Sequence, residues 1–224
     1  MKESEVYKCI SSDDIDSREA FIKDFDNELL QLSKLFSEAF ILLNASPCIS
    51  DLSERAGIVS AYLSLAIESA VTATQLLVLG HIAAAGNSMR ISYESLCYSA
   101  LLKKEVELEV PNGKYKFNFY SDYQKKSKHT RADSVIDVVV KNKELIGVNE
   151  EGVTFLTAAK NFYNGYSHAT LLLAHSKIKP STRQIYIAGG YDNERYETFK
   201  TQLNFITRYS LSLSGWVSAV AYNA

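Results

Sequence analysis

Cysteine, proline and long apolar runs are scarce in this sequence, and each scarcity excludes a class of protein. The chain of 224 residues has 3 cysteines without a C-x-x-C spacing, so we expect neither a disulfide framework nor a structural zinc site. Its N-terminus is too polar for a signal peptide, and its most apolar region, residues 63–85, is interrupted by Glu68, Gln75 and His81. These features predict a cytoplasmic protein that does not cross a membrane.

A strong excess of charge of one sign is also absent. The net charge is −2, from 24 lysines and arginines against 26 aspartates and glutamates, so no bulk attraction to nucleic acid or anionic membrane is expected. Hydrophobic residues make up 46% of the chain, which is ordinary for a folded globular protein of this length. A role with nucleic acid would therefore need a local basic patch.

The few prolines divide the chain into blocks. Pro47, Pro111 and Pro180 all fall between periodic segments, in which apolar residues recur at steps of three and four, as in an amphipathic helix. The predicted helices cover residues 17–44, 51–79, 82–104, 133–145, 150–166 and 192–222. We therefore predict a mainly α protein, an antiparallel bundle of six to seven helices, with residues 17–224 as one domain behind a polar segment, residues 1–16.

Some of the predicted helix ends carry recognisable signals. Asp51 followed by Glu54 resembles a capping box at the start of the second helix, with Ser50 as an alternative cap. Gly80 suits the end of that helix, because glycine readily adopts the left-handed conformation that closes many helices. Asp192 is the expected cap of the final helix.

A β-hairpin is predicted around Asn112–Gly113. Apolar and polar residues alternate on both sides of this dipeptide, which is a strong signal for a two-residue turn. Such a turn would pair Leu108 with Phe117 and Glu109 with Lys116 across the two strands. The alternative is that helix 82–104 continues through Glu109, because leucine, lysine and glutamate are good helix formers.

Arg90 and Glu94 are the first candidate functional residues. They lie four apart in the segment GNSMRISYESL, so they share a helix face and can pair. We expect the pair to be partly buried, with Glu68 of the preceding helix as a third member. Two interpretations stay open: a structural clamp, which is the commoner role of such an arginine, or a site for chemistry.

The second candidate is His168, in the segment KNFYNGYSHATLLLAHS. A histidine can act as acid, base or ligand near neutral pH, or it can simply cap the end of a helix. The expected polar support around it consists of Asn161, Tyr163, Tyr166 and Ser167. His175 lies too far along the chain to complete a metal site, and zinc signatures are absent, so we predict no metal and no cofactor.

A basic stretch follows the predicted hairpin and is interleaved with aromatic residues. Cations beside aromatic rings suit single-stranded nucleic acid, whereas the commoner alternative is a solvated face with the rings turned inward. The predicted RNA-binding residues are Lys125, Lys126, Lys128, Arg131 and, from the helix before His168, Lys160.

The segment around Arg90 is like the pattern A-x-x-x-R-x-x-x-E, with Gly86 at the place of the alanine, and a later helix ends in Y-x-x-Y-S-H at His168. Together they resemble a group of bacterial helical proteins similar in outline to the HEPN superfamily. The resemblance spans residues 50–222 and implies a metal-independent ribonuclease or an inactive, binding relative. Active HEPN ribonucleases carry an arginine that is separated from the histidine by four to six intervening residues, and at those positions this chain has Asn161, Phe162 and Tyr163. We hypothesise that Arg90 supplies that cation from another helix.

Two functions of different classes follow. The first is an RNA-directed effector in bacterial stress or phage defence, with His168 as base and Arg90 or Lys160 facing phosphate. The second is a non-catalytic binding or assembly module, a homodimer through the final helix around Trp216, in which Arg90, Glu94 and His168 form a structural network. A small-molecule pocket lined by some of the 14 tyrosines is a third alternative.

Overall fold

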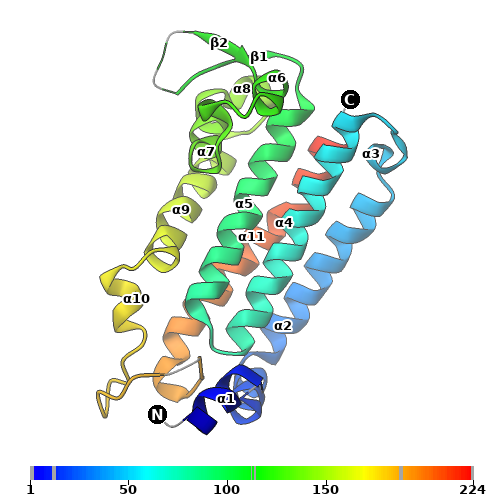
Figure 1. Cartoon of the computed structure of the whole chain (residues 1–224). Coiled ribbons are helices and arrows are strands. Elements are labelled where there is room, and N and C mark those ends of the chain that lie inside the picture. The colour runs from blue at the N-terminus through cyan, green and yellow to red at the C-terminus, as the bar shows by residue number, and fades with distance from the viewer. Residues whose placement is uncertain (1–2, 12–13, 112, 114, 187–188, 223–224) are drawn as a thin grey trace.

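The computed structural model describes residues 3–11, 14–111, 113, 115–186 and 189–222 of the chain. It is 77% helical, which confirms the predicted mainly α class (Figure 1). The helices that form the bundle are α2 (Ile15–Asn44), α4 (Glu54–Val78), α5 (Ile82–Lys103), α9 (Glu150–Ser167) and α11 (Tyr196–Ala221). Each of the predicted long helices therefore has its counterpart in the structure.

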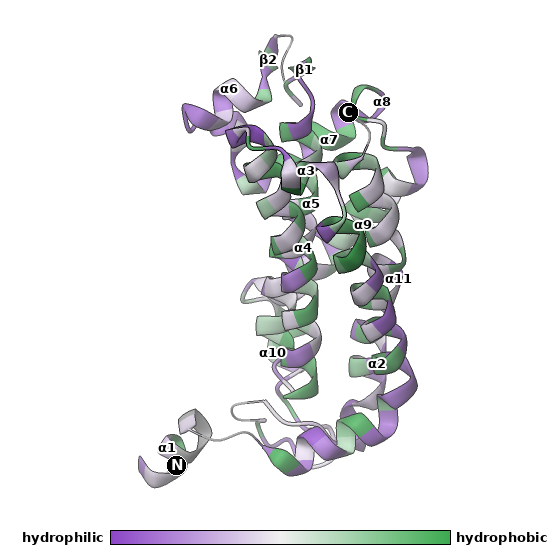
Figure 2. Ribbon diagram, turned by 90° about the vertical axis from the view of Figure 1, so that its right-hand side faces the viewer, coloured by the Kyte–Doolittle hydropathy of each residue, from purple (hydrophilic) through white to green (hydrophobic). Residues whose placement is uncertain are grey.

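Four of these helices make two layers. Figure 2 shows α4 and α5 in one layer and α2 and α11 in the other. Consecutive helices of the bundle run antiparallel, whereas α2 and α11 run in the same direction (Figure 1). Aromatic contacts between Phe21 and Phe199 near their starts, and a hydrogen bond from Tyr222 to the Leu42 carbonyl near their ends, fix this parallel pair.

Helix α9 packs on the outer side of α5. The two backbones approach closely because Gly86 lies against the Tyr166 side chain, where an added Cβ would meet the Cβ of Tyr166 at 2.9 Å. The short helices α7 (Ala132–Lys141) and α8 (Lys143–Ile146) cover the α5–α9 pair near one end of the bundle (Figure 1). This arrangement creates the boundary between α5, α7 and α9 on which the candidate site lies.

Short elements make up the rest of the described chain, and periodicity did not predict most of them because they span too few turns. They are α1 (Glu3–Ser11), α3 (Pro47–Ser50), α6 (Phe119–Gln124), α10 (Leu171–His175) and the 3-10 turns η1 (Lys128–Thr130) and η2 (Asn193–Arg195). Asp192 caps η2, which leads directly into α11.

The helix-end predictions had mixed outcomes. The cap of α4 is Ser53, whose hydroxyl accepts from the Ala56 N–H, so the predicted capping by Asp51 or Ser50 is wrong. The Asp51 carboxylate instead accepts from the Ser53 N–H, in a short turn that positions the true cap. Gly80 does close α4 as predicted, with φ of 79°.

The hairpin prediction is confirmed. Strands β1 (Glu107–Glu109) and β2 (Lys116–Asn118) pair antiparallel, with Leu108 opposite Phe117 and Glu109 opposite Lys116, in the predicted register. The side chain of Asn142 bonds both the N–H and the carbonyl of Glu109, which ties the hairpin to the end of α7. Asn112, in the predicted turn, lies outside the described residues.

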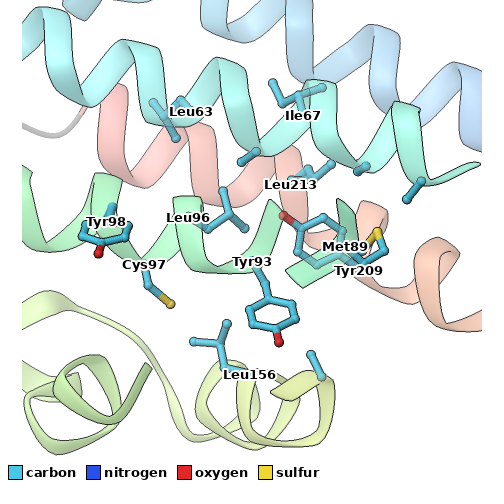
Figure 3. Packing of buried hydrophobic residues seen from close by; sticks show 14 of the residues in the cluster. Leu63, Ile67, Met89, Tyr93, Leu96, Cys97, Tyr98, Leu156, Tyr209 and Leu213 are labelled. Carbon is cyan, nitrogen blue, oxygen red and sulfur yellow. The ribbon is translucent and has the colours of Figure 1, made fainter. Parts of the chain in front are cut away.

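The core lies between α4, α5, α9 and α11 (Figure 3). In Figure 3, Tyr93 extends from α5 toward Leu156 of α9, while Leu63 and Ile67 of α4 pack from the opposite side. Cys97 is a buried free thiol, as its apolar setting predicted. Burial of these side chains supplies the main stabilising free energy of the fold.

Helix α4 has the length and mean hydropathy of a membrane-spanning helix, alone among the described helices. Half of its apolar window is buried inside the bundle, where α4 packs against α5, α2 and α11. A core helix meets the same criterion of length and composition, and that is the place α4 occupies.

Candidate functional site

Arg90 connects two residues that lie far apart in the sequence. Its Nε donates to Oε1 of Glu94 at 2.7 Å, and its Nη1 lies 3.2 Å from Nε2 of His168. The first contact is the predicted pairing one turn along α5. The second joins α5 to the end of α9, so the structure brings together the three residues proposed for chemistry.

The chain geometry after α9 positions His168. The helix ends at Ser167, and His168 adopts an extended conformation with φ of −120° and ψ of 164°. The Thr170 hydroxyl then accepts from the Leu173 N–H at 3.1 Å to cap α10, and it donates to the carbonyl of Gly165. These bonds hold the turn that carries the exposed His168 ring to Arg90.

The contact between Arg90 and His168 has only one possible direction. A guanidinium group has only donors, so Nη1 of Arg90 donates and Nε2 of His168 accepts. The same nitrogen becomes available as a base only when Arg90 turns to another acceptor.

Burial differs across the three residues. The Glu94 side chain is 12% exposed and that of Arg90 is 27% exposed, whereas His168 is open to solvent. Burial raises the pKa of the Glu94 carboxyl, and the hydrogen bond from Arg90 opposes this rise without cancelling it. The same hydrogen bond raises the pKa of Arg90. The group therefore presents a fixed cation and a solvent-facing imidazole above a buried acid.

Two further charged residues influence the site: Lys160, which was predicted to bind RNA, and Asp133, which was not predicted. The charge of Asp133, in the first turn of α7, raises the pKa of both Arg90 and Glu94. The charge of Lys160 of α9 lowers the pKa of Glu94. Lys160 itself pairs with Asp137 of α7 at 2.8 Å. The sequence carried no signal for this arrangement, because it depends on how α7 packs against α9.

The polar residues that were predicted to surround His168 lie in different environments. Tyr163 is buried beside Tyr93, with ring centroids 6.0 Å apart, and its hydroxyl has no hydrogen-bond partner in the described structure. Tyr166 is also buried, and nearby Gln202 of α11 partly offsets the rise that burial causes in its pKa. The Ser167 hydroxyl is buried without a partner among the described residues, whereas Asn161 is exposed. Burial raises the pKa of Tyr163 and Tyr166, which favours their neutral forms.

Glu68 does not join the site, contrary to the prediction. It is exposed on α4, where its Oε1 accepts from the Ser64 hydroxyl at 2.5 Å. The neighbouring positions 66, 67, 69 and 70 of α4 are buried, whereas Glu68 lies on the outer face of this helix. Because the residues around Glu68 are mostly apolar, the sequence did not reveal that this face of α4 is exposed.

The basic stretch is solvent-exposed at Lys125, Lys126, Lys128 and Arg131. Most of the interleaved rings turn inward: Phe117 and Phe119 are buried, and Tyr123 bonds Tyr62 of α4. The Tyr98 hydroxyl donates to the Thr130 carbonyl at 2.7 Å and holds this stretch against α5. Tyr98 lies two turns beyond Arg90, roughly 12 Å along the helix. The basic stretch is therefore held against α5, the helix that carries Arg90.

Arg195 is a buried charged residue that sequence reasoning missed. Its guanidinium lies over the rings of Tyr186 and Phe199, at 4.4 and 4.8 Å from their centroids, and donates to the carbonyls of Gly190 and Ser176. Burial lowers its pKa. It fixes the loop between α10 and α11, which makes its role structural.

Within the described residues, no three histidine, cysteine, aspartate or glutamate side chains gather in a way that could hold a metal ion. No family model, no curated protein and no solved structure matches this chain.

Proposed function

We propose that this protein is an RNA-directed effector that cleaves phosphodiester bonds without a metal ion, with His168 and Arg90 as the reacting pair. The observation that supports this most is the 3.2 Å contact between Arg90 and His168, made at a solvent-exposed position between two helices. A cation beside an imidazole is the pair of groups that ribose-assisted cleavage needs. The HEPN-like resemblance of the chain belongs to the same proposal.

The proposed reaction begins when a phosphate oxygen of RNA binds Arg90. Nη1 turns from His168 to the phosphate, which frees Nε2 to accept the proton of the adjacent 2′-hydroxyl. The 2′-oxygen bonds to phosphorus, the bond from phosphorus to the 5′-oxygen breaks, and water gives the departing oxygen its proton. The products are a 2′,3′-cyclic phosphate and a 5′-hydroxyl. Glu94 keeps the guanidinium oriented through Nε.

In this proposal, the exposed cations of the basic stretch bind the RNA substrate. Lys125, Lys126, Lys128 and Arg131 would neutralise phosphates of a single strand that runs along α5 toward Arg90. Lys160 contributes less in this scheme, because it is already paired with Asp137. The cellular setting that fits is the bacterial cytoplasm, in stress or phage defence.

The purified protein tests the proposal with a single-stranded RNA. We expect cleavage by the wild type and a rate lower by about 10²–10⁴-fold for His168→Ala, the usual contribution of a general base. His175→Ala is the matched control, because His175 is also an exposed histidine but lies on α10. Intact RNA with the wild type, or equal rates for wild type and His168→Ala, would overturn the proposal.

A second candidate function is a non-catalytic assembly module in which the same three residues are structural. It is favoured by the largely buried Glu94, whose only hydrogen-bonded side chain among the described residues is Arg90. Because Arg90 also contacts His168, the pair connects α5 to the end of α9. In this role Arg90→Ala lowers the free energy of unfolding by about 1–3 kcal/mol, since the Glu94 carboxylate loses its partner. An unchanged melting temperature for Arg90→Ala would contradict this role.

A further inference from the structure

A cleft with a volume of about 960 Å³ lies between α9 and α11. Its third wall is the C-terminal half of α5, from Leu96 to Lys104. Arg90, Glu94 and His168 do not line it, so it is separate from the candidate site. Ligand pockets of proteins have volumes of this order.

The cleft exists because α9 and α11 both pack on α5 but diverge from each other. They touch where Phe162 of α9 stacks on Phe205 of α11, with ring centroids 4.2 Å apart and an angle of 5° between the planes. Phe155 of α9 also contacts Phe205 and Tyr209, at centroid distances of 6.0 and 6.2 Å. Past these rings the lining of α11 includes two small residues, Gly215 and Ala219. A Cβ added at Gly215 would meet nothing within 4 Å, so the space beside it is open.

The walls of the cleft are apolar along their length. Phe155 and Leu156 line it from α9, and Trp216 and Val220 line it from α11. The indole N–H of Trp216 donates to the Leu96 carbonyl at 3.2 Å, so the ring is held in the wall with its polar atom satisfied. On α11 the lining extends from Phe205 to Val220, roughly 22 Å at the rise of an α-helix. The cleft is therefore elongated along α11.

Charge is distributed unequally between the two ends of the cleft. At the end near Phe205, Arg208 is exposed and forms no ion pair or hydrogen bond within the part of the chain that the structure describes. At the other end, Lys103 and Lys104 share the rim with Glu150 and Glu151. An anionic group is therefore favoured at Arg208, where no carboxylate lines the wall.

We propose that this cleft binds an amphipathic anion with an unbranched acyl chain, such as a long-chain carboxylate. The carboxylate pairs with the guanidinium of Arg208, which can donate two parallel hydrogen bonds to it. The chain lies along Phe155 and passes Gly215 toward Trp216. This binding site does not depend on the proposed RNA chemistry.

Trp216 reports directly on the cleft, because it is the single tryptophan of the chain. Titration of the protein with dodecanoate is expected to give a saturable change in tryptophan emission. Dodecanol, which lacks the charge, and the variant Arg208→Gln with dodecanoate should each bind about tenfold more weakly or worse, as for a lost charge-assisted hydrogen bond. Absence of a saturable change, or equal affinity for dodecanol and dodecanoate, would overturn the proposal.

A second variant blocks the apolar part of the cleft and leaves Arg208 in place. Gly215→Leu places a side chain in the open space and favours the helix, so the protein should fold while dodecanoate binding is lost. Gly57→Leu is the matched control: Gly57 lies in α4, where a Cβ also meets nothing within 4 Å, and its binding should stay unchanged. Sedimentation of the same samples tests for a second copy as occupant. A wild-type dimer that Gly215→Leu dissociates would overturn the proposal.

Discussion

At the scale of single residues, Arg90 has two partners of different character. Glu94 is one turn away on the same helix and largely buried, while His168 is exposed and separated from Arg90 by 78 positions. The first partner follows from helix geometry, since residues four apart share a face. The second depends on the tertiary packing of α9 against α5, which no local pattern encodes. The pairing of Arg90 with Glu94 was therefore predictable, and its approach to His168 was only a hypothesis.

Glu94 makes the stability of the protein depend on pH. Burial raises the pKa of its carboxyl above the ordinary value of 4.5, so the folded chain holds this proton more tightly than the unfolded chain. The contribution of Glu94 to the free energy of unfolding is therefore greatest at low pH and falls as the pH rises above 4.5. We expect the free energy of unfolding of the wild type, minus that of Glu94→Gln, to decrease between about pH 4 and pH 7.

Urea denaturation of both proteins at several pH values measures this difference. Glutamine keeps the size of the side chain and cannot ionise, so other titrating groups cancel in the subtraction. A difference that stays constant or grows with pH would contradict a raised pKa at Glu94.

At the scale of elements, helix ends were less predictable than helix bodies. Asp51 and Ser50 satisfied the sequence signals for a cap, but Ser53 occupies the position from which a side chain reaches the free N–H of Ala56. Several candidate caps lay within four residues, and only the exact start of the helix selects among them. The hairpin was predicted in the correct register, because alternation and a two-residue turn leave one pairing that matches both the apolar residues and the charges.

Gly80 is the connection between α4 and α5 and is expected to tolerate no side chain. Its φ of 79° lies in the left-handed region, and a Cβ there would overlap the backbone of Gly190. We therefore expect Gly80→Ala to lower the free energy of unfolding by at least about 1–2 kcal/mol. Chemical denaturation measures this change.

Gly57→Ala is the control for that experiment, since Gly57 lies inside α4 with open space around it. There the methyl group should raise the free energy of unfolding by up to about 1 kcal/mol, because glycine is a poor helix former. A loss of stability in Gly57→Ala equal to that in Gly80→Ala would refute the role of the α4–α5 turn.

At the scale of the whole molecule, α9 separates two surfaces with different chemistry. The boundary with α7 carries Lys160 and its partner Asp137, and the end of α9 carries His168 to Arg90. The boundary with α11 is an apolar cleft. Periodicity predicted α9 itself but not its neighbours, because a helix pattern shows which face is buried and not against which helix it packs. Both surfaces therefore became visible only in the folded chain.

The central claim is that Arg90 and His168 form a site for ribose-assisted cleavage of RNA. The most direct measurement compares a single-stranded RNA with the same sequence made of DNA, followed by analysis of the ends of the products. The account predicts that the wild type cleaves only the RNA and leaves 2′,3′-cyclic phosphate and 5′-hydroxyl ends, since the attacking group is the 2′-hydroxyl. Cleavage of both strands at similar rates, or of neither, would contradict it.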